Sequence, residues 1–166
     1  MGIDSEGKKI PIQLGHFFLA VKIEAFVELE KFKKHAGDIC RGLRKSKKAP
    51  GAVGPYSQAV QAGHLVFASG QIPIQPESGN IEADDIEGQT EQSMKNVQAI
   101  LAAAGITFDE VVKTTIYLTD MAYFSTVNDV YGRYFKKSLP ARSCVGISKL
   151  PKGALVEVEV VAYCER

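Results

Sequence analysis

The sequence of 166 residues has no tryptophan, three cysteines, three histidines and no apolar run of membrane-spanning length. A transmembrane helix needs about 18 or more consecutive apolar residues. Lysine and arginine number 20 against 19 aspartates and glutamates, so the chain lacks the positive charge typical of an obligate nucleic-acid binder. With 45% hydrophobic and 23% charged residues, the composition is that of a globular protein. It excludes collagen, disorder and a disulfide-rich toxin.

The cysteines, Cys40, Cys144 and Cys164, are widely spaced and form no C-x-x-C pair. The histidines do not supply the short ligand spacing of a zinc site, so no metal is expected. Free thiols fit a reducing compartment. The apolar run 17–21 is too short for a secretory signal. We therefore expect a cytoplasmic location, or a mitochondrial one if the N-terminal segment is a targeting sequence.

Charge divides the chain into two parts. Residues 1–48 carry 11 Lys/Arg and 6 Asp/Glu, whereas residues 49–166 carry 9 and 13. The first part is predicted to hold an amphipathic helix over 17–35, followed by a basic, solvated linker at 41–48. Two interpretations of this N-terminal extension stay open. It is either a docking or targeting helix, or an appendage with no role in the chemistry.

The second part, 49–166, is predicted to be an α+β domain with one mixed sheet and two helices on one face. Strands are expected over 56–61, 64–69, 71–76, 111–118, 142–149 and 154–164, and helices from Asp84 to Ala104 and from Asp120 or Ser125 to about Phe135. The uncovered face of such a sheet must be solvated or covered by another subunit. Valines dominate the last strand, which favours an oligomer.

Common catalytic motifs are absent: the sequence has no G-x-S-x-G, no phosphate-binding glycine loop and no H-E-x-x-H. His64 falls at a predicted hairpin turn and is expected on the surface, which leaves no histidine base in the domain. The chemistry must therefore come from other polar side chains.

The last two strands are predicted to pair as a hairpin through the turn at 150–153. If Lys149 pairs with Ala154, side-chain alternation places five residues on one face: Arg142, Cys144, Gly146, Glu157 and Glu159. An arginine offers a bidentate fork to a small carboxylate, and a glutamate can accept a proton. The alternative is an exposed ladder of charged pairs along an ordinary sheet.

Three other positions attract attention. Gly54-Pro55-Tyr56-Ser57 leads into a strand and would direct the tyrosine. Ser69-Gly70-Gln71 interrupts a strand where backbone can approach a ligand, although a β-bulge explains the glycine equally well. Asn128 is a poor helix former inside a helical pattern.

These positions belong to an ordered set of motifs that resembles the Rid (YjgF-type) family, in particular its imine deaminase A branch. The motifs run in this order: Gly54-Pro55-Tyr56-Ser57-Gln58-Ala59, Ala68-Ser69-Gly70-Gln71-Ile72-Pro73, Asn96-Val97, Val112-Lys113-Thr114-Thr115, Thr126-Val127-Asn128-Asp129-Val130-Tyr131, Pro140-Ala141-Arg142-Ser143-Cys144-Val145 and Val156-Glu157-Val158-Glu159. The resemblance covers residues 49–166, and the first 40 residues have no counterpart in it.

The resemblance implies a chorismate-mutase-like fold that forms a homotrimer with a ligand cleft at each subunit interface. It also implies hydrolysis of reactive 2-imino acids, such as 2-iminobutanoate and 2-iminopropanoate, to 2-oxo acids and ammonia, without a cofactor. Arg142 would bind the substrate carboxylate, Glu157 would activate water, and Cys144 would contribute to the catalytic set. The cleft would also be lined by Tyr56, Ser69, Gly70 and Asn128.

Two other functions remain open. Some members of the family are described as ribonucleases or translation inhibitors, a role that the acidic balance of 49–166 disfavours. A trimer could also bind small carboxylates through Arg142 without catalysis. No membrane partner is expected.

Overall fold

The computed structural model describes residues 2–3, 9–10, 40–42 and 46–165. The chain forms two compact units, Met1–Ile39 and Cys40–Arg166. In the first unit, β1 (Gly2–Ile3) pairs antiparallel with β2 (Lys9–Ile10). The helix predicted over 17–35 lies outside the described residues.

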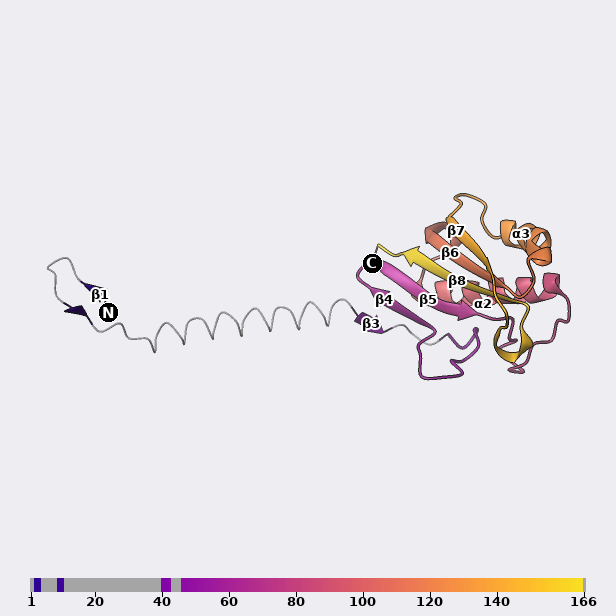
Figure 1. The fold of residues 1–166 in the computed structure, drawn as a ribbon, viewed down its shortest axis with the longest axis horizontal. Helices are drawn as coiled ribbons and strands as arrows, with labels where there is room; N and C mark the ends of the chain where they lie inside the picture. The colour runs from indigo at the N-terminus through magenta and orange to yellow at the C-terminus, as the bar shows by residue number, and fades with distance from the viewer. Residues whose placement is uncertain (1, 4–8, 11–39, 43–45, 166) are drawn as a thin grey trace. The chain divides into compact units, whose positions relative to one another are not determined.

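The second unit is built on a six-stranded mixed sheet (Figure 1). Its spatial order is β3 (Cys40–Gly42), β4 (Ala59–Ala62), β5 (Leu65–Gln71), β8 (Val156–Tyr163), β6 (Val111–Leu118) and β7 (Ala141–Gly146). Neighbouring strands are antiparallel except β6 and β7, which are parallel. Strand β3 occupies the start of the basic run that was expected to be a solvated linker. Pairing with β4 at the sheet edge accounts for the difference.

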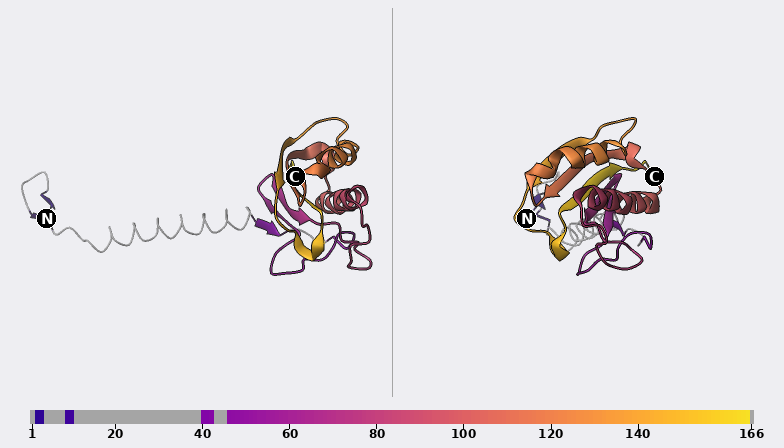
Figure 2. Two further views of the ribbon diagram at one scale, coloured as in Figure 1. Left: turned by 45° about the vertical axis from the view of Figure 1, so that its right-hand side comes forward. Right: turned by 90° about the vertical axis from the view of Figure 1, so that its right-hand side faces the viewer.

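Two α-helices, α2 (Ile86–Ala104) and α3 (Phe124–Gly132), cover the same face of this sheet (Figure 2). Helix α2 begins after Asp85, one residue later than predicted, because it is the Asp85 carboxylate that accepts the Gly88 N–H at 2.8 Å. The helix ends at Gly105, which takes the left-handed conformation with φ 74°. Asp120 caps a 3₁₀ turn, η2 (Met121–Tyr123), that leads into α3.

The early hairpin of the sheet is confirmed, but the strand predicted over 71–76 is wrong. Ala62 pairs with Leu65 around a tight turn, as the hairpin pattern predicts. Strand β5 then ends at Gln71, and Ile74 makes only an isolated bridge to Ile81. Pro73 has no N–H to donate, so an apolar run containing it cannot continue as an inner strand.

The predicted terminal hairpin is also wrong, because β6 lies between β7 and β8. The connection 147–155 passes around the end of β6. At one end of this connection Ile147 donates to the carbonyl of Leu118, and at the other the Leu155 carbonyl accepts the Thr119 N–H. It includes a 3₁₀ turn, η3 (Pro151–Gly153), and is too long for a two-residue hairpin.

This topology changes which residues share a face. Ile116 of β6 stands opposite Cys144 on one side and Val158 on the other, whereas Thr115 stands opposite Ser143 and Glu159. Partners in register share a face. Arg142 and Cys144 therefore lie on the helix-covered face, and Glu157 and Glu159 lie on the opposite face. Gly146 lies opposite Leu118, on the same face as Arg142, so the prediction that all five residues share one face is wrong.

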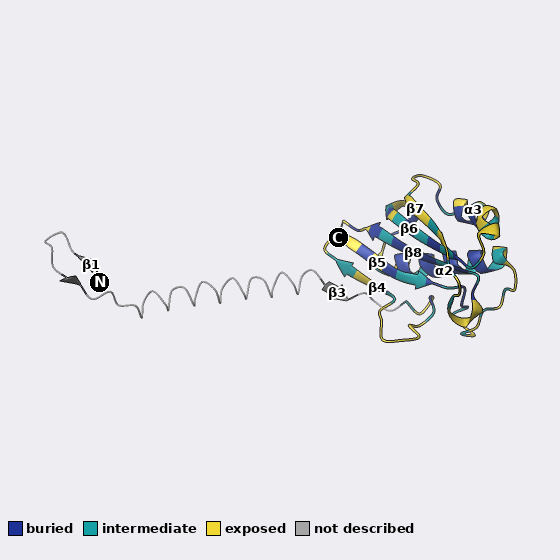
Figure 3. Ribbon diagram, viewed as in Figure 1, coloured by how far each residue is buried: buried dark blue, intermediate teal, exposed yellow. Residues whose placement is uncertain are grey.

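The core lies between the helices and the sheet (Figure 3). Alternate residues of β8 are buried there: Val156, Val158, Val160 and Ala162. On the opposite, open face, five large apolar side chains are at least 38% exposed: Val60, Leu65, Phe67, Val145 and Tyr163. The sheet thus has one face packed and one face partly apolar but uncovered in a single chain.

No helix in the described part of the chain is long and apolar enough to span a membrane.

Asn96 of α2 holds the chain where it leaves β5. Its side chain is 1% exposed and donates to the carbonyls of Ile72 at 3.0 Å and Ile74 at 2.9 Å. The change Asn96→Ala leaves both carbonyls without this donor, so we expect the free energy of unfolding to fall by about 2–3 kcal/mol in urea titrations. The exposed Gln98→Ala on the same helix is the control and should change it by less than about 0.5 kcal/mol. Equal effects of the two changes would contradict this role.

Candidate functional site

A β-bulge in β5 brings backbone against Glu157. The register of β5 on β8 shifts between Ala68 and Gln71, so Ser69 and Gly70 form the bulge. A Cβ atom at Gly70 would overlap the Glu157 carboxylate. The β-bulge interpretation of this glycine is therefore confirmed, whereas the approach of a ligand to this backbone stays a prediction. The group that approaches it in the structure is a carboxylate of the neighbouring strand.

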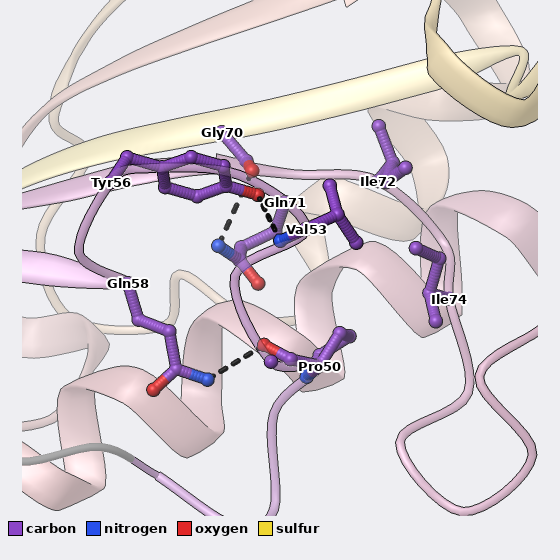
Figure 4. A pocket seen from close by; sticks show the side chains of 9 residues that line it. Pro50, Val53, Tyr56, Gln58, Gly70, Gln71, Ile72 and Ile74 are labelled. Carbon is purple, nitrogen blue, oxygen red and sulfur yellow. Dashed lines mark hydrogen bonds between the residues drawn. The ribbon is translucent and has the colours of Figure 1, made fainter.

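Ser69 is part of this bulge, and Tyr56 belongs to the segment beside it. Ser69 Oγ donates to the Ser57 carbonyl at 2.7 Å, and Ser69 N donates to the Gln58 carbonyl at 2.9 Å. Tyr56 lines a small pocket together with Gly70 (Figure 4). The segment that carries Tyr56 is held by Gln58, whose amide donates to the Pro50 carbonyl at 2.6 Å. We call Tyr56, Ser69, Gly70 and Glu157 the glutamate half-site.

The carboxylate of Glu157 is half-buried on the open face of the sheet. Burial raises the pKa of Glu157, and the negative charge of Glu159 raises it further. Glu159 is held by the Tyr117 hydroxyl, which donates to it at 3.3 Å. Burial and the two carboxylates also raise the pKa of Tyr117, so this phenol remains a donor. A carboxyl group with a raised pKa is better suited to accept and return a proton than an ordinary surface carboxylate.

Arg142 lies on the other face of the sheet, against α3. Its guanidinium carbon is 4.9 Å from the centre of the Tyr131 ring and 5.7 Å from that of Phe124. The Tyr131 hydroxyl shares a 2.9 Å hydrogen bond with Thr114 Oγ1, which orients the ring. Among the described residues Arg142 has no carboxylate partner, so its charge is available to an anion.

Cys144 lies on the same face of β7 as Arg142, and Asn128 belongs to α3, the helix whose rings contact this arginine. Asn128 is half-buried on α3, on the same helical stripe as Phe124 and Tyr131. Cys144 is next but one to Arg142 on β7 and packs against the core. Burial raises the pKa of the Cys144 thiol, and the opposing effects of Arg142 and the Val145 N–H are smaller. The thiol is therefore protonated at neutral pH and a poor nucleophile. We call Asn128, Arg142 and Cys144 the arginine half-site.

The structure thus divides the predicted site residues into two groups. Within one chain, the glutamate half-site faces away from the helices and the arginine half-site faces α3. Neither half alone offers both an anion-binding cation and a carboxylate base. His64 is exposed, as predicted, and stacks on Tyr163 at 5.7 Å.

Sequence reasoning missed four residues that support these groups: Gln71, Tyr117, Phe124 and Tyr131. The two aromatics and Asn128 recur at four- and three-residue steps, so a helical stripe could have been recognised. The contact of Phe124 and Tyr131 with Arg142 depends on the position of β7 beside β6, to which it is parallel. No local sequence pattern indicates that position. Among the described residues, no cluster of histidine, cysteine, aspartate or glutamate could hold a metal ion.

Residues 46–164 match the family described as Endoribonuclease L-PSP. The chain belongs to this family. It is the Rid (YjgF-type) family, and the matched range contains both half-sites.

Individual relatives agree with this Rid-family assignment. A RutC family protein of Pyrococcus horikoshii is 49% identical over 72% of this chain and 95% of its own length. A human protein named 2-iminobutanoate/2-iminopropanoate deaminase is 44% identical over 75% of this chain and 90% of its own length. The structure of Escherichia coli TdcF with bound serine shares 42% identity and a TM-score of 0.70, covering 73% of this chain and 97% of that one. The chorismate-mutase-like fold of this family is thereby confirmed.

Glu159 provides a test of the electrostatics of the glutamate half-site. The change Glu159→Gln removes a negative charge but keeps an acceptor for Tyr117, so we expect the pKa of Glu157 to fall. Because the folded-state pKa of Glu157 is raised, stability decreases as pH rises from the unfolded-state value through the folded-state value, and the change should lessen that loss. NMR titration of ¹³C-labelled glutamate side chains measures the shift.

The control for this titration is the exposed Glu77→Gln, which removes a charge far along the chain from β8. It should leave the Glu157 pKa unchanged. An unchanged pKa in Glu159→Gln as well would show that Glu157 does not sense its neighbour.

Proposed function

We propose that this protein hydrolyses 2-imino acids to 2-oxo acids and ammonia, at a site that two copies of the chain complete together. One observation carries the proposal. Among the described residues, the chain offers an aromatic-stacked arginine without a carboxylate partner and a half-buried glutamate, but on opposite faces of its sheet. A small substrate with a carboxylate and a hydrolysable carbon–nitrogen bond uses both groups only if neighbouring copies bring them together.

The names of relatives support the substrate class. The human relative is named for 2-iminobutanoate and 2-iminopropanoate. The Escherichia coli relative holds serine, a small molecule with the same carboxylate on its first carbon. Other names in the family are RutC and endoribonuclease, and these do not specify an imino acid. The choice of imino acid is therefore part of this proposal and of its test.

In this proposal Arg142 binds the substrate carboxylate. A guanidinium presents two parallel N–H donors to the two carboxylate oxygens. The stacked rings of Phe124 and Tyr131 limit the rotation of the arginine side chain, so less of its conformational freedom is lost on binding. By holding the carboxylate, Arg142 positions the neighbouring carbon–nitrogen double bond relative to Glu157.

Glu157 then acts as the base. Its carboxylate takes a proton from a water molecule while the oxygen forms a bond to the imine carbon, whose π electrons move to nitrogen. The protonated Glu157 returns the proton to the nitrogen of the resulting carbinolamine. The Glu157 carboxylate then takes the hydroxyl proton of the carbinolamine and passes it to nitrogen as the carbon–nitrogen bond breaks, so that ammonia leaves and the carbonyl forms. A carboxyl group with a raised pKa suits both steps, because it must accept and then donate.

Cys144 has a different part in this reaction from that of a nucleophile. Its raised thiol pKa leaves little thiolate at neutral pH. We assign it, with Asn128, to lining the cleft beside Arg142. Tyr56, Ser69 and Gly70 line the half of the cleft that carries Glu157.

The assembly follows from the open face of the sheet. Five large apolar side chains are exposed there, next to Glu157 and Glu159. A second copy of the chain covers this apolar surface and brings its β7 edge, with Arg142, to the Glu157 of its neighbour. Closed rotational symmetry repeats this heterologous contact, and the resemblance of the motifs favours three copies.

Arg142→Ala tests the carboxylate anchor. We expect kcat/KM for freshly generated 2-iminopropanoate to fall about 100-fold or more, since a charge-assisted bidentate pair is lost. An amino-acid oxidase supplies the imine, and semicarbazide traps whatever is not hydrolysed. Arg133→Ala is the matched control, because Arg133 is an exposed arginine paired with Glu87. Near-wild-type turnover in Arg142→Ala would remove Arg142 from the site.

The same assay with Glu157→Gln separates catalysis from simple binding. Loss of the base should lower kcat by about 10²–10⁴-fold. A protein that only binds carboxylates would show no turnover in the wild type, yet would keep its ligand affinity in Glu157→Gln.

Mixed oligomers test whether two copies share each site. Arg142→Ala and Glu157→Gln chains, each inactive alone, should regain activity when they are co-expressed, because an interface can combine an intact Arg142 with an intact Glu157. For random trimers containing equal amounts of each chain, about a quarter of the sites are complete. Co-expression of each variant with itself is the control. Mixed oligomers without activity would show that each site lies within one chain.

A further inference from the structure

Gln71 is a buried polar residue directly after the bulge that contacts Glu157. Its side chain is 6% exposed. Its amide nitrogen lies 2.9 Å from the Ser69 carbonyl oxygen. It also lies 3.3 Å from the Gly70 carbonyl oxygen (Figure 4). Because the Gln71 amide donates to the two residues that precede it, this hydrogen bonding does not connect the helices to the sheet. Its effect is local, on the conformation of the bulge.

The bulge needs such a donor. Cross-strand pairs join Ala68 to Val160 and Gln71 to Val158, but none is formed by the two bulge residues. Carbonyls in a bulge lose regular ladder partners, and buried carbonyls without partners are costly. Gln71 reaches back from the helix-covered face and supplies the donor that the ladder does not. The hydrogen bonds therefore favour this particular bulged backbone over a relaxed one.

The other surface of the same bulge faces Glu157. There is no room for even a methyl group between Gly70 and the Glu157 side chain. The backbone at Gly70 thus excludes water from one side of the carboxylate and limits where its oxygens can lie. Within the part of the chain that the structure describes, Glu159 affects the pKa of this carboxylate, and the carboxylate in turn affects the pKa of Tyr117.

The segment that follows is held in the same manner. Asn96 binds the carbonyls of Ile72 and Ile74 from α2. Residues 69–74 are therefore anchored from the helix side by two buried amides, one on each side of the point where the chain leaves the sheet. Gln71 is the anchor that contacts the bulge itself.

We propose that Gln71 is a positioning residue, which holds the Ser69–Gly70 bulge closed against the Glu157 carboxylate and so fixes the base that attacks the substrate through water. This inference rests on the proposed function for the part that concerns catalysis. The part that concerns the environment of Glu157 is independent of any substrate.

The test is Gln71→Met, which keeps the length and volume of the side chain but removes its donor. We expect kcat for 2-iminopropanoate to fall about tenfold, because the base becomes less well oriented, with KM changed less than about twofold, because Arg142 is untouched. A looser bulge also admits water to Glu157, which lowers its raised pKa. The acidic limb of the kcat–pH profile should therefore move to lower pH.

Thr90→Val is the matched control. Thr90 is also buried, and its hydroxyl donates to the Ile86 carbonyl at 2.7 Å, within α2 rather than to the bulge. It should lower the melting temperature to a similar degree while leaving kcat and the pH profile unchanged. If Gln71→Met matches Thr90→Val in kcat and in pH profile, the positioning role is overturned. Should Gln71→Met not fold, Gln71→Asn, which withdraws the amide by one carbon, replaces it.

NMR titration of the Glu157 carboxyl separates this inference from the proposed function. A lower Glu157 pKa in Gln71→Met than in both wild type and Thr90→Val supports the role of Gln71, even if the wild type hydrolyses no imine. An unchanged Glu157 pKa overturns it, even if the wild type is an active deaminase.

Discussion

The central constraint in this fold is the pairing of β6 with β7 on one edge and β8 on the other. Because side chains alternate along each strand, that pairing assigns each residue of β7 and β8 to a face. It places Arg142 and Cys144 beneath α3 and turns Glu157 toward the open side. A shift of one residue in the β6–β8 pairing would bury the glutamates and expose the valines. The hydrophobic core and the distribution of the site residues are therefore set by the same hydrogen bonds.

The surroundings of Glu157 affect the stability of the fold and the proton affinity of the carboxylate in different ways. Contact with the Gly70 bulge and the nearby charge of Glu159 both disfavour its ionised form, which weakens the fold at neutral pH. The same features give the carboxyl group a raised pKa, suited to accepting and returning a proton. Destabilisation at such a position is compensated by the buried valines of β8 and by the amides of Gln71 and Asn96, which hold the surrounding backbone.

The arginine half-site differs from the glutamate half-site in how its charged group is accommodated. Arg142 is exposed and has no carboxylate partner among the described residues, so its charge carries little desolvation cost before a ligand binds. Aromatic rings from α3 restrict its position instead. Each half-site is thus prepared within its own chain, and we attribute their combination to assembly through the open face. The apolar residues of that face are costly in a single chain and useful in an oligomer.

The sequence by itself determined the α+β class, helix α2 with its glycine terminator, strand β6 and the first hairpin, and it made Arg142 and Glu157 candidates for the site. These features depend on periodicity, caps and motif residues, which are local. Only the tertiary structure decided that β6 separates β7 from β8, that Gln71 supports the bulge and that α3 aromatics stack on Arg142. Strand order depends on contacts between residues far apart in sequence, and the turn at 150–153 is compatible with either a hairpin or a crossing around β6. The strand order then determined on which face of the sheet Arg142 and Glu157 lie.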